Sequence, residues 1–128
     1  MIVVRTPDSV RVVLQKMSAV LSAQGYRLDS VRATYVTTKA RPFSAPAGGL
    51  RVPVTYTLRV AARPVGSGTQ LLLTGAWVDD RNPKYHFVIP MRWIGPGDQL
   101  QDQACFDYAD KVAKAYPNGQ VSYRGKKQ

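Results

Sequence analysis

"LRVPVTYTLRVAARPVGSGTQLLLTGAWVDD", residues 50–80, is the stretch of the sequence that decides the fold. Its first half alternates between apolar and polar side chains, and successive side chains of a strand point to opposite faces of a sheet. This alternation predicts a strand with one buried face. "GSG" at 66–68 is typical of a tight connection, and the following residues again favour a strand. The stretch therefore predicts an antiparallel hairpin. Its buried face would carry Val52, Val54, Tyr56, Leu58, Val60 and Ala62.

The segments on both sides of the hairpin predict two amphipathic helices. Residues 2–5 favour a short strand, and apolar residues then recur at helical spacing over about 7–24, after Thr6 as a cap. Gly25 is a favourable end for this helix. The second helix would begin near Asp98. Its apolar stripe would consist of Cys105, Tyr108, Ala109, Val112 and Tyr116.

The remaining segments complete the expected order of elements. Residues 26–40 favour strand structure, the proline and glycine of "RPFSAPAGG" at 41–49 favour a loop, and "KYHFVIPMRW" at 84–93 favours the last strand of the meander. We expect a single domain over residues 1–120 and a basic C-terminal tail over 121–128.

The expected fold is α+β, with the order β-α-β-β-β-β-α. Two helices would pack on one face of an antiparallel sheet of about four to five strands, which is a two-layer domain. The other face of the sheet would carry arginine and threonine side chains.

The composition is strongly basic and excludes several kinds of chemistry. Lysine and arginine number 18 against 8 aspartates, and glutamate is absent, so the net charge is +10. Such a chain attracts nucleic acid, anionic lipid or an acidic protein. With one histidine, His86, and one cysteine, Cys105, the sequence supports neither a metal centre nor a nucleophilic triad. We expect a non-enzymatic protein without a cofactor or metal, and no apolar run is long enough to span a membrane.

Two stretches carry a resemblance to a known family. "TPDSVRVVLQKMSAVLSAQGYRLDSVRATYVTTKARP" at 6–42 and "YTLRVAARPVGSGTQLLLTGAW" at 56–77, followed by a closing helix, resemble in layout small bacterial envelope domains of the outer-membrane lipoprotein type. These include helix-grip domains such as those of the C component of the β-barrel assembly machinery. The resemblance implies a fold of the helix-grip or TBP-like type and a module that docks onto protein partners. We expect a periplasmic or envelope-associated location if the N-terminus was trimmed, and a cytoplasmic one otherwise.

The basic residues predict where such docking would occur. The candidate docking face consists of Arg51, Arg59, Arg63, Lys84, His86 and Arg92, and the tail adds Arg124, Lys126 and Lys127. The expected partner is an acidic protein or an anionic lipid surface, with the chain as an accessory or structural subunit of a larger assembly.

Two alternatives remain open on the sequence alone. The same basic face could bind the phosphates of a nucleic acid. A third possibility is a small hydrophobic ligand carried in a cavity, which would be lined by Tyr26, Tyr35, Tyr56, Trp77 and Trp93.

Overall fold

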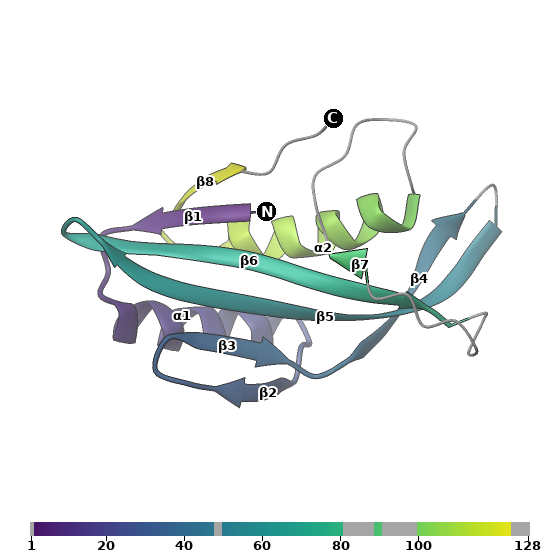
Figure 1. Ribbon diagram of the computed structural model, residues 1–128, viewed down its shortest axis with the longest axis horizontal. Helices are drawn as coiled ribbons and strands as arrows, with labels where there is room; N and C mark the ends of the chain where they lie inside the picture. Colours follow the sequence, from purple (N-terminus) through teal and green to yellow (C-terminus); the bar gives the residue numbers. More distant parts are fainter. Residues whose placement is uncertain (1, 48–49, 81–88, 91–99, 124–128) are drawn as a thin grey trace.

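The computed structural model describes residues 2–47, 50–80, 89–90 and 100–123, which form an antiparallel sheet and two helices. Both helices lie on the same side of the sheet, so the molecule has two layers (Figure 1). The expected α+β class, the antiparallel sheet and the pair of helices are therefore confirmed.

The hairpin predicted from residues 50–80 is the longest feature of the sheet. Strand β5 (Leu50–Val65) pairs with β6 (Gly68–Asp79) continuously from Val54↔Asp79 to Val65↔Gly68. The two-residue turn between them begins with Gly66, whose φ of +60° is a conformation that favours glycine. Glycine at the first turn position is typical of a type II′ hairpin turn, whose twist matches that of the paired strands.

The other strands extend this hairpin in both directions. The order across the sheet is β2-β3-β5-β6-β1-β8, and every pairing is antiparallel. The strands are β1 (Ile2–Thr6), β2 (Leu28–Val31), β3 (Tyr35–Thr38) and β8 (Gln120–Tyr123). In addition, β4 (Arg41–Ala47) pairs with β5, and β7 (Ile89–Pro90) pairs with β6.

The expected sheet of four to five strands is wrong, because the described residues form eight. Residues 26–40, expected as one strand, form β2 and β3, and residues 120–123 form β8. The remaining addition is the segment 41–47, which was expected to be a loop and is strand β4. Its prolines, Pro42 and Pro46, lack the N–H that a central strand needs. Among the described residues β5 is the only strand that pairs with β4, and an edge strand tolerates proline.

The last described residues also belong to the sheet. β8 pairs with β1 from Arg5↔Gln120 to Ile2↔Tyr123, so ordered pairing continues into the expected tail. Asn118, at φ +60°, lies in the turn that leads from the second helix into this strand. Residues 124–128 lie outside the described residues, as does most of the predicted strand 84–93.

The apolar stripe predicted for the first helix is buried as expected, and that of the second is confirmed in part, at Ala109, Val112 and Tyr116. Helix α1 (Val10–Ala23) is capped by Ser9, whose side chain accepts from the Val12 N–H, and not by Thr6 as expected. Gly25, at φ +88°, follows its end. Helix α2 (Leu100–Ala115) and the turn after it bury a stripe consisting of Phe106, Ala109, Val112, Ala113 and Tyr116.

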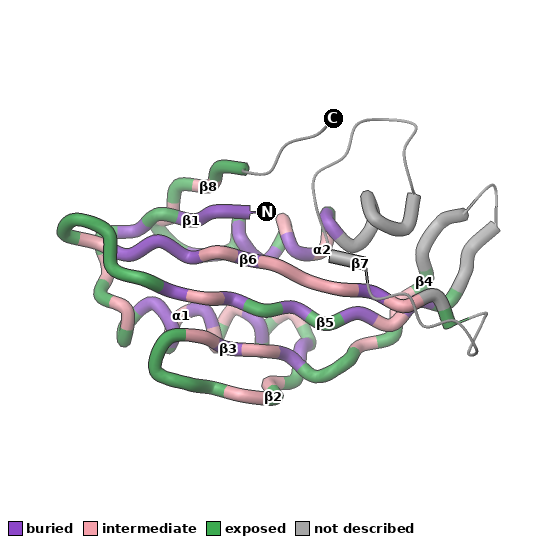
Figure 2. The backbone as a smooth tube through the Cα atoms, viewed as in Figure 1, coloured by how far each residue is buried: buried purple, intermediate pink, exposed green. Residues whose placement is uncertain are grey.

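The core lies between the helices and the inner face of the sheet (Figure 2). The buried residues of β5 are Val54, Tyr56, Leu58, Val60 and Ala62, which confirms the predicted alternation. Residues of β1 and β6 join them from the same face, and Val13, Leu14, Met17 and Leu21 cover them from α1.

A buried hydrogen bond joins the end of β3 to the centre of β5. The backbone N–H of Leu58 donates to the Thr38 hydroxyl at 3.0 Å, beyond the last backbone pair of these strands, Thr37↔Arg59. We expect Thr38→Val to lower the free energy of unfolding by about 1–3 kcal/mol, because a buried donor loses its acceptor. Thr37→Val, on the outer face, is the matched control and should change it by less than about 0.5 kcal/mol. Urea unfolding checks both, and equal effects would contradict the expectation.

Candidate functional site

The outer face of the sheet, opposite the helices, carries the described part of the predicted docking face. Arg59 and Arg63 of β5 are both exposed, and they alternate with the buried residues of the strand. The sheet register adds a third arginine. Arg63 pairs with Gln70 of β6, and Gln70 pairs with Arg5 of β1, so the two arginines flank Gln70 in one row. Since neighbouring strands lie about 4.8 Å apart, Arg5 and Arg63 are separated by about 10 Å at the backbone.

Arg59 is held in place on this face. Its guanidinium carbon lies 4.5 Å from the centre of the Tyr35 ring, which belongs to β3. A cation above an aromatic ring is attracted by the negative face of the ring, so this contact orients the charge without neutralising it.

An apolar row crosses the sheet between the arginines. Tyr35, Ala61, Leu72 and Val3 are consecutive partners across β3, β5, β6 and β1. Val3 is only 1% exposed, whereas Leu72 and Ala61 are half-buried. The outer face therefore combines an apolar middle with arginines beside it. We call this set, Arg5, Arg59 and Arg63 around the apolar row, the outer basic face.

The charges on this face have one sign within the central strands. The outward positions of β1, β3, β5 and β6 carry no carboxylate among the residues described. Asp80, just beyond β6, accepts a hydrogen bond of 2.6 Å from the Thr55 hydroxyl at the far end of the face. The outer basic face therefore presents a positive field to a partner.

The structure describes part of the predicted site. The backbone of Arg51 lies in β5, where Arg51 pairs with Pro46 of β4. Outside the described residues lie Lys84, His86, Arg92, Arg124, Lys126 and Lys127. Arg5 was missed by the sequence reasoning, because its place beside Arg63 depends on the pairing of β1 with β6. The alternation of "IVVR" at 2–5 was the available signal.

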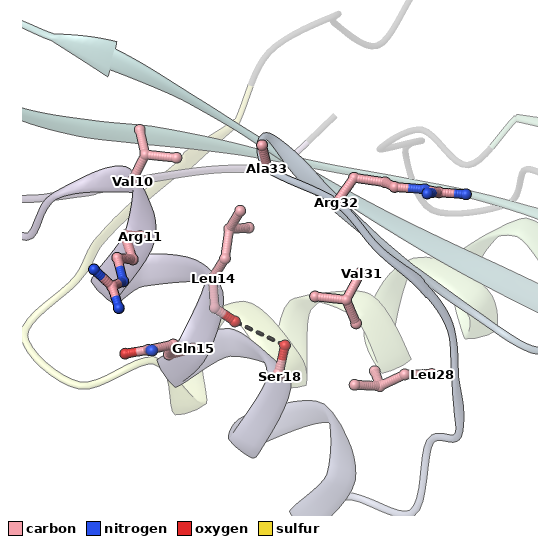
Figure 3. A pocket seen from close by; sticks show the side chains of 9 residues that line it. All are labelled: Val10, Arg11, Leu14, Gln15, Ser18, Leu28, Val31, Arg32 and Ala33. Carbon is pink, nitrogen blue, oxygen red and sulfur yellow. Dashed lines mark hydrogen bonds between the residues drawn. The ribbon is translucent and has the colours of Figure 1, made fainter.

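A second surface feature is an apolar groove between α1 and β2 (Figure 3). Its volume is about 770 Å³, and Leu14 from the helix and Val31 from the strand lie on its opposite sides. The Ser18 hydroxyl donates to the Leu14 carbonyl at 2.7 Å, so it is already engaged. The full lining consists of Val10, Arg11, Leu14, Gln15, Ser18, Leu28, Val31, Arg32 and Ala33.

The aromatic cavity suggested by the sequence is not formed as expected. Tyr26, Tyr56 and Trp77 are buried in the core, and the Tyr26 and Tyr56 hydroxyls are hydrogen-bonded at 2.6 Å. Tyr35 lies on the opposite face, under Arg59. These four rings therefore do not line a common cavity, and Trp93 lies outside the described residues.

A polar network joins the beginning of α1 to the end of α2. Asp8 accepts hydrogen bonds from the Tyr116 hydroxyl at 2.7 Å and from Lys16 Nζ at 3.0 Å. The Tyr116 bond, followed by the Lys16 bond, holds the pKa of Asp8 below its ordinary value. Burial, together with the bond to Asp8, raises the pKa of Tyr116 to about 12. Each of these polar groups has a hydrogen-bond partner within the network, which is typical of a structural role.

Neither metal binding nor membrane crossing finds support in the described part of the chain. It contains no group of three or more His, Cys, Asp or Glu side chains that could hold a metal ion. No described helix combines the length and apolar character needed to cross a membrane.

The Asp8–Tyr116 contact makes stability dependent on pH at both extremes. The neutral Tyr116 phenol is favoured in the folded state, so its contribution is complete below pH 10 and is lost as the pH rises from about 10 to about 12. The Asp8 carboxylate contributes above its unfolded pKa of about 3.8, and this contribution is lost as the pH falls.

Tyr116→Phe should therefore reduce the loss of stability above pH 10, as measured by urea midpoints. Tyr35→Phe, which removes a hydroxyl on the opposite face of the sheet and keeps the ring beneath Arg59, is the control. Parallel curves for wild type and Tyr116→Phe would contradict this expectation.

A comparison of the sequence with models of known protein families gives no match, and a search of curated proteins gives none either.

Proposed function

We propose that the chain is a non-enzymatic protein-interaction module that binds an acidic surface of a partner through the outer basic face. The observation that carries the proposal is the arrangement of Arg5, Arg59 and Arg63 around an apolar row on the side of the sheet away from the helices. Protein interfaces combine an apolar centre with arginine, which is enriched among residues that dominate binding energy. Carboxylates of a partner would pair with the arginines, and its apolar side chains would cover Leu72 and Ala61.

The apolar row favours a protein over a nucleic acid as partner. Binders of single strands stack bases on exposed aromatic rings. On the outer basic face, Tyr35 lies beneath the Arg59 guanidinium, and its row continues with the aliphatic residues Ala61, Leu72 and Val3. A purely electrostatic phosphate contact remains the runner-up, and it predicts a different dependence on salt.

Two further parts of the proposal concern the fold family and the location of the protein in the cell. We propose that the chain is a helix-grip domain and that it serves as an accessory subunit of an envelope-associated assembly. The support is the order of elements over residues 6–116 and the packing of both helices on one face of the sheet. The anionic lipid surface is the second partner that the basic charge would suit.

Affinity capture with the full chain as bait tests the docking proposal. A variant with Arg5, Arg59 and Arg63 changed to Glu should lose at least about 90% of the captured partner, because three attractive contacts become repulsive. The matched control changes Arg11, Lys111 and Lys114, which are exposed on the two helices in the other layer of the molecule, to Glu. Circular dichroism must show that both variants are folded.

Three outcomes would contradict the proposal. One is a partner that the outer-face variant retains, and another is the absence of any captured partner. The third is binding of a random-sequence duplex of 20 base pairs whose affinity falls by about 10³-fold or more between 50 and 200 mM salt. This result would favour the nucleic-acid alternative.

A further inference from the structure

The groove between α1 and β2 is an apolar surface that the described core does not fill. Leu28 and Val31 belong to the helix side of the sheet, since they pair with the buried residues Thr38 and Val36 of β3. Leu28 is partly buried against the core, whereas Val31 is left 57% exposed. A β-branched side chain on the inner side of a sheet is normally buried. The groove of about 770 Å³ therefore has the size of a small-molecule site, for which about 300–1,000 Å³ is typical.

Two arginines border this apolar floor. Arg11 extends from α1 and Arg32 from the turn after β2, at opposite sides of the lining, and their guanidinium groups point outward from it (Figure 3). Neither guanidinium forms an ion pair with a carboxylate of the described chain. Arg41, by contrast, is engaged: it donates to the Gln24 carbonyl at 2.7 Å and lies over the Tyr26 and Phe43 rings. Within the described residues these two cations at the rim have no ion-pair partner, so they favour an anionic group in an occupant that lies along the groove.

Several occupants fit the groove poorly. An added peptide strand would need a regular edge, whereas β2 has four residues and its register shifts between Leu28 and Ser30. A second copy of the chain would bring another net charge of +10 to a positive border. A nucleic acid would satisfy the arginines but has no aliphatic group for Leu14, Leu28 and Val31.

We propose that the groove binds a single-chain anionic amphiphile, with an acyl chain along Val10, Leu14, Leu28 and Val31 and a carboxylate or similar acidic head near Arg11 or Arg32. The acyl chain would cover the apolar side chains of the groove, which the hydrophobic effect favours. The head accepts charge-assisted hydrogen bonds from a guanidinium. The proposal does not rest on the outer basic face, which lies on the opposite side of the sheet, so either surface can fail without the other.

The probe is sodium laurate, titrated below its micelle concentration into the ¹⁵N-labelled full chain. Saturable binding of one molecule is expected, with amide shifts concentrated in residues 10–18 and 28–33. Dodecyltrimethylammonium has a tail of the same length and a cationic head, and it should bind at least about tenfold more weakly. Sodium acetate, which has the head without the tail, should give no saturable shift at the same concentrations.

Charge reversals separate the groove from general electrostatics. Arg32→Glu and Arg11→Glu together should weaken laurate binding at least about tenfold, whereas Arg63→Glu with Arg5→Glu on the outer basic face makes the same change in net charge and should alter it less than about twofold. Val31→Asp places a carboxylate in the groove at an exposed position, so it should abolish binding while the chain stays folded by circular dichroism.

Four results would overturn the proposal. They are the absence of saturable laurate binding, shifts centred outside residues 10–33, equal binding of the anionic and cationic amphiphiles, and equal effects of the two double reversals. A monomer–dimer equilibrium that broadens the same amides without any probe would assign the groove to a second copy and would overturn it as well.

Discussion

The register between β5 and β6 is the constraint on which the rest of the structure depends. The ladder from Val54↔Asp79 to Val65↔Gly68 fixes which residues of both strands face the helices. β3 and β4 pair with β5, and β1 pairs with β6, so each inherits its faces from this ladder. A shift of one residue would turn Tyr56 and Leu58 outward and Thr57 and Arg59 inward. The cost of burying those polar groups holds the register in place.

Local patterns predicted the centre of the fold, and tertiary pairing decided its periphery. The alternation of residues 50–65 and the periodicity of α1 each involve many side chains, so one burial pattern dominates. β4 was missed because Pro42 and Pro46 usually indicate a loop, and only its position at an edge makes them compatible with a strand. The cap was assigned to Thr6, which instead lies buried at the end of β1, and Ser9 has that role. Arg5 and the groove depend on which elements become neighbours, which no local pattern contains.

The large positive charge of the chain is divided among different physical roles. Lys16 and Lys114 pair with Asp8 and Asp110, and Arg41 supports the end of α1 and two aromatic rings. Arg59 is oriented by Tyr35, while Arg5 and Arg63 extend from the same face. Arg11 and Arg32 border an apolar groove on the helix side. The basic side chains behind the net charge of +10 are therefore not gathered in one patch. Those on the two sides of the sheet lie in different chemical surroundings.

The pairing of Ile2 with Tyr123 brings the first and last described strands together as neighbours. Their outer ends lie at the same corner of the sheet (Figure 1). A few linking residues would therefore suffice to join them, and the exposed Gly66–Ser67 turn offers a place to open the chain. The fold is in this sense suited to circular permutation. A domain or surface tether joined directly to Ile2 or to Tyr123 would leave from that one corner.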